Sequence, residues 1–126
     1  MRRVAFLIAL AILTVGTARA ESADLRGVWT AEDGSGAARI DVCERSVDRL
    51  CATVIAETPE PGAPSTIGSV VLSNLAPAGP SRWRGLYHTG TQNLPATIRA
   101  RGADQVEMRV CVGIFCSTEK YRRTAR

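Results

Sequence analysis

Short segments in which polar and apolar residues alternate, separated by Gly and Pro, constrain the fold of this chain more than any other feature. Within residues 38–43, for example, Ile40 and Val42 fall on one face and their polar neighbours on the other. This period of two residues is that of a β-strand, whose successive side chains point to opposite faces of a sheet. The alternation predicts an all-β, antiparallel fold. We expect eight strands, at residues 27–32, 38–43, 50–55, 70–75, 82–88, 94–101, 105–112 and 115–122.

The first twenty residues have the organisation of a cleavable signal peptide. Arg2 and Arg3 precede residues 4–15, which are apolar apart from one threonine, and small residues follow at the expected cleavage site after Ala20. A helix of this length spans about 18 Å, short of the ~20 residues that cross a bilayer, which disfavours an uncleaved membrane anchor. We therefore expect a periplasmic or secreted protein. Residues 1–20 are the expected signal peptide, and residues 21–126 form a single domain with no transmembrane span.

The net charge of +4 belongs mostly to that leader. Residues 1–20 hold three of the 16 basic residues and none of the 12 acidic ones, so the remaining chain has a net charge of +1. This balance disfavours a nucleic-acid partner. Four basic residues gather between Lys120 and Arg126. They favour a solvated chain end over the alternative of contact with a membrane surface or another anionic partner.

All four cysteines, Cys43, Cys51, Cys111 and Cys116, follow the leader. An even number in an oxidising compartment favours disulfides. No two cysteines form a C-x-x-C motif and His88 is the one histidine, so we expect neither a metal site nor a redox pair, and no cofactor. Three pairings are open. The strand pattern favours the local pairs 43–51 and 111–116.

The expected strands test both local pairs. If Cys111 lies opposite Cys116, then Glu107 lies opposite Lys120 on the outer face and the apolar residues between them point inward. The same test on 43–51 sets Val42 against Ala52 and Ile40 against Val54, all inside. Directly opposed Cα atoms are about 4.5–5.5 Å apart, within disulfide reach.

One segment also fits a helix. Its apolar residues are spaced at the period of an amphipathic helix, at Val47, Leu50, Cys51, Val54 and Ile55. The β-branched run at residues 53–55 favours a strand from about Leu50. Whether residues 44–55 contain a helical turn is left open.

Five short motifs follow one another along residues 25–124. They are Gly27-x-Trp29 with the turn Glu32–Gly36; Arg39-Ile40, Cys43, Leu50-Cys51 and Val54; Trp83-Arg84-Gly85; residues 106–111; and Cys116 with Tyr121 and Arg123. In this order the chain resembles the bacterial envelope family catalogued as domain of unknown function 2147. It departs from that family's pattern at Tyr121, where the family has tryptophan, at Val110, where it has glycine, and in its shorter loop from Pro59 to Ser69.

The resemblance implies a small lipocalin-like antiparallel β-barrel of about eight strands, cross-linked by two local disulfides and without a settled activity. By analogy with other calycin-type barrels, it implies that Arg123 stacks on Trp29 and closes one end of the barrel. This role is structural.

A barrel of eight strands can hold one small ligand. The small residues expected to point inward, Ala31, Ala52, Ala96 and Ala100, fit either a cavity or a narrow, filled barrel. We expect a non-enzymatic binding protein with a small apolar or amphipathic ligand. The candidate ligand-facing side chains are Trp83, Tyr87, Met108, Glu119 and Tyr121.

Two alternatives belong to other functional classes. A protein inhibitor of an extracytoplasmic protease or lysozyme, with a protein partner in the envelope, would use the loop of residues 58–69 or the arm of residues 21–25. An enzyme would have to use His88 and Glu119, for which the sequence nominates no nucleophile and no metal set. We therefore expect no catalytic residues.

Overall fold

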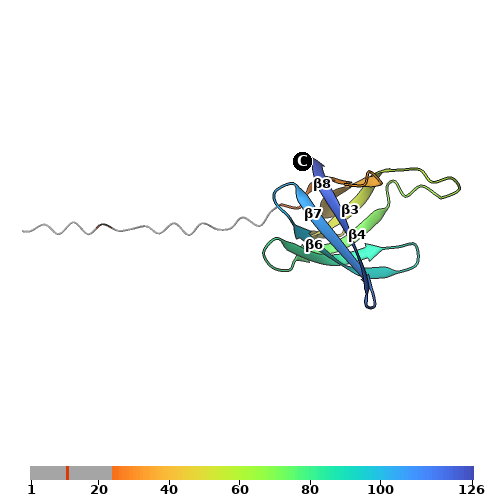
Figure 1. The fold of residues 1–126 in the computed structure, drawn as a ribbon. Helices are drawn as coiled ribbons and strands as arrows, with labels where there is room; N and C mark the ends of the chain where they lie inside the picture. Colours follow the sequence, from red (N-terminus) through yellow and green to blue (C-terminus); the bar gives the residue numbers. More distant parts are fainter. Residues whose placement is uncertain (1–10, 12–23) are drawn as a thin grey trace, which may run out of the picture.

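The computed structural model describes Ala11 and residues 24–126, and the expected signal peptide therefore lies almost entirely outside the described residues. Residues 24–126 form one antiparallel β-barrel (Figure 1). The strands are β1 (Gly27–Ala31), β2 (Gly36–Cys43), β3 (Ser46–Glu57), β4 (Val70–Pro77), β5 (Arg82–His88), β6 (Asn93–Ala100), β7 (Gln105–Val112) and β8 (Phe115–Ala125).

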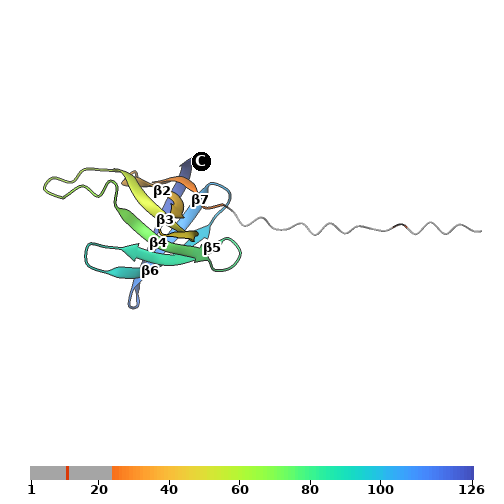
Figure 2. The same cartoon turned by 180° about the vertical axis from the view of Figure 1, so that it is seen from behind.

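Each strand pairs with the next along the chain, and β8 returns to pair with β1. The prediction of an all-β, eight-stranded antiparallel barrel is confirmed. Closure leaves the barrel with no free sheet edge. The β1–β2, β3–β4, β5–β6 and β7–β8 connections lie at one end, which we call the open end (Figure 2). The remaining connections and both termini of the barrel lie at the other, the closed end.

The β7–β8 hairpin has the predicted register. Cys111 lies opposite Cys116 and Glu107 opposite Lys120. The disulfide between the two cysteines is formed, with an S–S distance of 2.06 Å. The strands are joined by a two-residue turn, in which Gly113 has a φ of 60°. A type II′ turn takes glycine at this position, because the backbone there is left-handed.

The β2–β3 register differs from the predicted one. Ile40 lies opposite Ala52, two residues from its predicted partner, and Val42 is 48% exposed instead of facing the core. The cause is a β-bulge between Val42 and Cys43, where the Val42 N–H donates to the Asp41 side chain at 2.8 Å. Val42 pairs with Leu50 but Cys43 pairs with Ser46, so residues 47–49 of β3 have no partner in β2. The alternation slips at this irregularity, and Cys43 turns inward.

The Cys43–Cys51 disulfide is nevertheless formed, with a Cα–Cα distance of 5.0 Å, so both predicted pairings are confirmed. The helical alternative for residues 44–55 is wrong, because β3 runs without a break from Ser46 to Glu57. The strand gains hydrogen-bonded neighbours on both sides, β2 and β4, which outweighs the weak helical spacing of its apolar residues.

The apolar core fills the closed half of the barrel. Leu25, Leu75 and Trp83 are buried there to 5% exposure or less. The remaining members of the core come from six of the strands and surround this group: Trp29, Ile40, Ala52, Leu72, Ala96, Ile98, Val106 and Met108. Bulky side chains at one end and small ones at the other leave an unfilled volume toward the open end.

Candidate ligand-binding cavity

A cavity of about 700 Å³ occupies the open half of the barrel. Its floor is formed by core residues, among them Trp29, Ile40 and Met108. Its mouth is bordered by the β1–β2 turn at Ser35, the β3–β4 loop at Thr66 and the β5–β6 turn at Thr89. The barrel is thus closed at one end and accessible at the other.

Small side chains make the room for this cavity. Alanines of β1, β2 and β3 line one wall, at positions 31, 37, 38, 52 and 56. Of the four small residues expected to point inward, Ala31 and Ala52 line the cavity, whereas Ala96 and Ala100 do not. Of the candidate ligand-facing residues, Tyr87, Met108, Glu119 and Tyr121 line it. Trp83 is 5% exposed in the packed core and lines no cavity of the barrel that we describe.

Glu119 and Tyr121 form a polar pair on the β8 wall of the cavity. The Tyr121 hydroxyl donates to Glu119 Oε2 at 2.5 Å. Burial of the phenol, together with its bond to the carboxylate, raises the pKa of Tyr121 well above its ordinary value. Tyr121 is therefore a neutral donor throughout the physiological range. The pair offers a ligand one carboxylate and one phenolic oxygen on the β8 wall.

Glu57 organises one side of the mouth. Its carboxylate accepts hydrogen bonds from the Ser65 hydroxyl at 2.6 Å and from the Thr66 N–H at 3.0 Å. These bonds lower the pKa of Glu57 below its ordinary value, with Ser65 making the largest contribution. The loop of residues 58–69, predicted to be exposed, is exposed along its length and is held at its base by this carboxylate.

A second, smaller cavity of about 350 Å³ adjoins the first. The two share Tyr87, Met108 and Glu119 as lining residues. The smaller one reaches outward to Leu94 of β6 and Phe115 of β8. An elongated ligand could therefore extend past Glu119 toward the tip of the β7–β8 hairpin.

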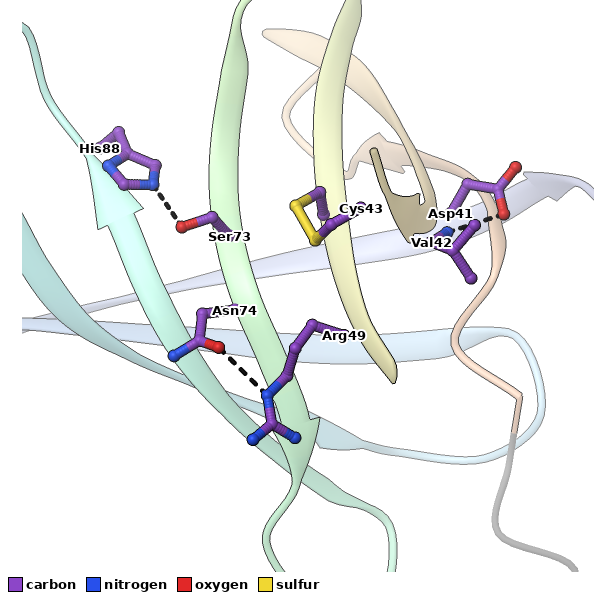
Figure 3. Close-up of a disulfide and its surroundings, with 8 residues drawn as sticks. Asp41, Val42, Cys43, Arg49, Ser73, Asn74 and His88 are labelled. Atoms are coloured by element: carbon purple, nitrogen blue, oxygen red, sulfur yellow. Dashed lines mark hydrogen bonds between the residues drawn. A yellow bond between two sulfur atoms is a disulfide. The ribbon is translucent and has the colours of Figure 1, made fainter. Parts of the chain in front are cut away.

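His88 lies at the end of β5, where it helps to line the larger cavity, and forms a row of hydrogen bonds with Ser73 and Asn93. Its Nε2 lies 2.6 Å from the Ser73 hydroxyl (Figure 3), and its Nδ1 lies 2.6 Å from Asn93 Oδ1. An amide oxygen can only accept, so Nδ1 carries the proton and Nε2 accepts from Ser73. A serine activated by histidine has this polarity. Ser73 and Asn93 line neither cavity, whereas His88 between them lines the larger one.

The sequence did not predict this hydrogen-bonded row of side chains. Ser73, His88 and Asn93 are brought together by the pairing of three strands, β4, β5 and β6. His88 and Glu119, the pair that an enzyme would have to use, both line the larger cavity, but His88 bonds to Ser73 and Asn93 whereas Glu119 bonds to Tyr121. No hydrogen bond or ion pair joins His88 to Glu119 within residues 24–126.

Arg123 and Trp29 close the other end of the barrel. The Arg123 guanidinium lies 4.4 Å from the Trp29 ring centroid. It donates to the carbonyl oxygens of Arg26 and, at 2.6 Å, of Asp24. Arg123 belongs to β8, which continues to Ala125, so the basic end of the chain is a paired strand and is not frayed. The other basic side chains there, Lys120, Arg122 and Arg126, are exposed, as predicted for a solvated end. Pairing with β1 satisfies the backbone of the last residues and orders them.

Among residues 24–126, no three His, Cys, Asp or Glu side chains come close enough to hold a metal ion. No helix in the described part of the chain is long and apolar enough to cross a membrane. The molecule is thus a closed, disulfide-linked β-barrel with a ligand-sized interior cavity. Comparison with protein-family models, with curated proteins and with solved structures found no match.

Proposed function

We propose that this chain is an exported, non-enzymatic binding protein that holds one small apolar or amphipathic ligand inside its barrel. The observation that carries the proposal is the cavity of about 700 Å³, closed at the Trp29 end and accessible at the other. Ligand-binding cavities in proteins measure about 300–1,000 Å³ and have mostly apolar walls with a few polar groups. The resemblance to the envelope family of unknown function supports the same class of protein.

The charges around the cavity restrict the ligand further. Glu57 and Glu119 line it, and no lysine or arginine of the described residues does. A carboxylate or phosphate deep in the barrel would meet like charge without a cation to pair with, which is unfavourable in a partly dry site. We therefore propose an apolar body with an uncharged or cationic polar group, the latter placed near Glu119 and Tyr121.

Export is supported by the organisation of residues 1–20 and by both disulfides, since such bonds persist in oxidising compartments. We propose the periplasm or the extracellular space as the location, with cleavage after Ala20.

The first test is a native mass spectrum of the protein exported from a bacterial host, recorded without reductant. We expect a chain that begins at Glu21, has lost four hydrogens to two disulfides and carries an additional mass that denaturation removes. A bare chain that also fails to take up the neutral fluorescent probe N-phenyl-1-naphthylamine contradicts the proposal of an internal ligand.

A matched pair of variants localises the bound molecule. Ala38 lines the cavity, so Ala38→Leu is expected to fill part of it and to abolish uptake of the probe. Ala76 of β4 is similarly half-buried and does not line either cavity, so Ala76→Leu is the control. Equal loss of uptake in both variants would mean that the probe binds elsewhere.

A second candidate, an inhibitor of an extracytoplasmic protease or lysozyme, is favoured by one observation. The loop of residues 58–69 carries an exposed Ile67 and is anchored at its base by Glu57, as a loop that enters an enzyme cleft would be. The arm is a weaker choice, because Leu25 is 2% exposed and packs into the barrel. Inhibition of an exported lysozyme or protease that is lost on Ile67→Ser would support this candidate.

A further inference from the structure

The β7–β8 hairpin ends in an apolar tip, which we define as Val112, Ile114 and Phe115. These side chains are 54%, 90% and 78% exposed. The Cys111–Cys116 disulfide links the strands directly behind them, and the hairpin projects from the barrel (Figure 1). The tip is therefore a constrained turn that presents three large apolar groups together. Such a cluster marks a surface that a partner covers, whereas single exposed apolar residues need no explanation.

The outer face of β5–β8 is strongly basic. The strand register aligns Arg84, Thr97, Arg109 and Thr118 in one row across the sheet. The next row contains Arg82, Arg99, Glu107 and Lys120, and Arg122 of β8 follows it. Glu107 is the one acidic residue in these rows, and it pairs with Arg101 at 2.9 Å. We call this surface the basic face.

The opposite side of the barrel lacks this imbalance. On the β2–β3 hairpin, three acidic residues stand among three basic ones, namely Asp41, Glu44 and Asp48 with Arg39, Arg45 and Arg49. The positive charge is thus concentrated on the side of the molecule that also carries the apolar tip, since β7 and β8 contribute to both. The small net charge of the chain hides this separation.

We propose that the apolar tip and the basic face together dock the protein on a lipid bilayer that carries anionic headgroups. Interfacial membrane binding has two contributions. Apolar side chains enter the boundary between headgroups and acyl chains, and basic side chains beside them attract anionic lipid. In a tilted pose the tip enters this boundary while the basic face lies along the headgroups. An acidic protein would satisfy the basic face but would leave the apolar tip without a partner.

The test measures binding of the chain from Glu21 to sedimenting vesicles. The apolar residues 4–15 are omitted because they would bind lipid themselves, and residues 24–126 contain the complete barrel and both disulfides. We expect binding to phosphatidylcholine vesicles that contain phosphatidylglycerol and much weaker binding to phosphatidylcholine alone. Ile114→Ser combined with Phe115→Ser is expected to weaken binding by about tenfold or more, because both side chains lose their insertion.

The basic face has its own variant. Arg84→Gln combined with Arg109→Gln is expected to weaken binding about 25-fold, at about fivefold per charge, and to reduce its dependence on salt. Arg39→Gln combined with Arg45→Gln removes the same net charge from the other side and is expected to change binding little. Val47→Ser is the control for the tip, because Val47 is 84% exposed at the closed end of the barrel.

Insertion itself is read from Phe115→Trp, whose fluorescence is expected to shift to the blue on anionic vesicles, whereas that of Val47→Trp stays unchanged. Three results would overturn the proposal. They are no binding of the parent to anionic vesicles, equal binding of the tip variant, and an equal loss in the Arg39 and Arg45 variant. The test does not depend on an occupied cavity, so the proposed ligand and the proposed membrane surface can fail separately.

Discussion

The guanidinium of Arg123 lies 4.4 Å over the ring of Trp29 and at the same time donates hydrogen bonds to the segment that precedes β1. One side chain of the last strand therefore fastens the entry of the chain to the bottom of the barrel. Trp29 completes the arrangement, since its Nε1–H donates to the Leu25 carbonyl at 2.8 Å. Residues from the first and last strands of the barrel thus form one cap, which closes the barrel at this end.

Replacing Arg123 tests this cap. Arg123→Gln is expected to lower the free energy of unfolding by about 2–4 kcal/mol, because a guanidinium that is 6% exposed loses its stacking on Trp29 and its bonds to the Asp24 and Arg26 carbonyl oxygens. Arg122→Gln is the control, since Arg122 is exposed on the other face of the same strand. Urea unfolding followed by tryptophan fluorescence measures both. Equal stability of the two variants would contradict the structural role.

Trp29 carries the apolar part of the cap. Trp29→Ala is expected to cost about 3–5 kcal/mol, because Trp29 is 3% exposed and its removal leaves a large void at the closed end. A thermal melt measures the effect. A Trp29→Ala protein that melts like the parent would show that the cap contributes nothing to stability.

Gly85 of β5 allows the distorted part of β4 to lie close to it. A Cβ at this position would meet the Ser73 carbonyl oxygen at 2.5 Å and Leu75 Cδ2 at 2.8 Å. Gly85→Ala is therefore expected to lower the free energy of unfolding by about 1–3 kcal/mol. Gly90→Ala is the matched control, because no heavy atom lies within 4 Å of the Cβ that it adds. Both are measured by urea unfolding, and a neutral Gly85→Ala would mean that β4 moves away without cost.

The β7–β8 hairpin could be predicted in detail from the sequence because its register is decided locally. Two cysteines five residues apart and a glycine in the turn fix which residues oppose each other. The β2–β3 hairpin could not, because its register depends on the bulge at Val42. At this bulge residues 47–49 of β3 have no partner in β2 and the Val42 amide bonds to the Asp41 side chain, and alternation of residue types carries no sign of either.

The candidate site was predictable only in part, because some of its residues are brought together by strand registers that the sequence does not show. The alternation of side chains along β8 is enough to place Glu119 and Tyr121 on the inner wall. The chain formed by Ser73, His88 and Asn93 depends on how β4 pairs with β5, where the register shifts between Ser73 and Ala76 and Asn74 adopts a φ of 55°. The cavity exists because bulky residues such as Trp83 pack at the closed end. The alternation of side chains along a strand does not predict at which end they pack.

The loop at the mouth is expected to respond to acid. The lowered pKa of Glu57 means that its carboxylate keeps the bonds to Ser65 and Thr66 above its ordinary pKa, and that these bonds are lost as the pH falls through the lowered value. The protection factor of the Thr66 amide, which is its intrinsic exchange rate at the given pH divided by its measured rate, is therefore expected to fall in acid, and Glu57→Ala is expected to lower it in the same way at neutral pH. An unchanged exchange rate in the variant would mean that the carboxylate does not hold the loop.

At high pH the pair of Glu119 and Tyr121 is expected to limit stability. Burial and the bond to Glu119 raise the pKa of Tyr121 in the folded chain above its value of about 10 in the unfolded chain. The stabilisation is therefore complete below about pH 10 and is lost as the pH rises beyond it, because the unfolded chain releases the phenolic proton first. Tyr121→Phe has no proton to release at this position, so its free energy of unfolding is expected to fall less steeply in alkali than that of the parent. Urea unfolding at several alkaline pH values measures the two slopes, and ultraviolet absorbance reports whether the phenol ionises only on unfolding. Parallel slopes would mean that Tyr121 ionises in the folded barrel, and thus that the carboxylate beside it does not hold its proton.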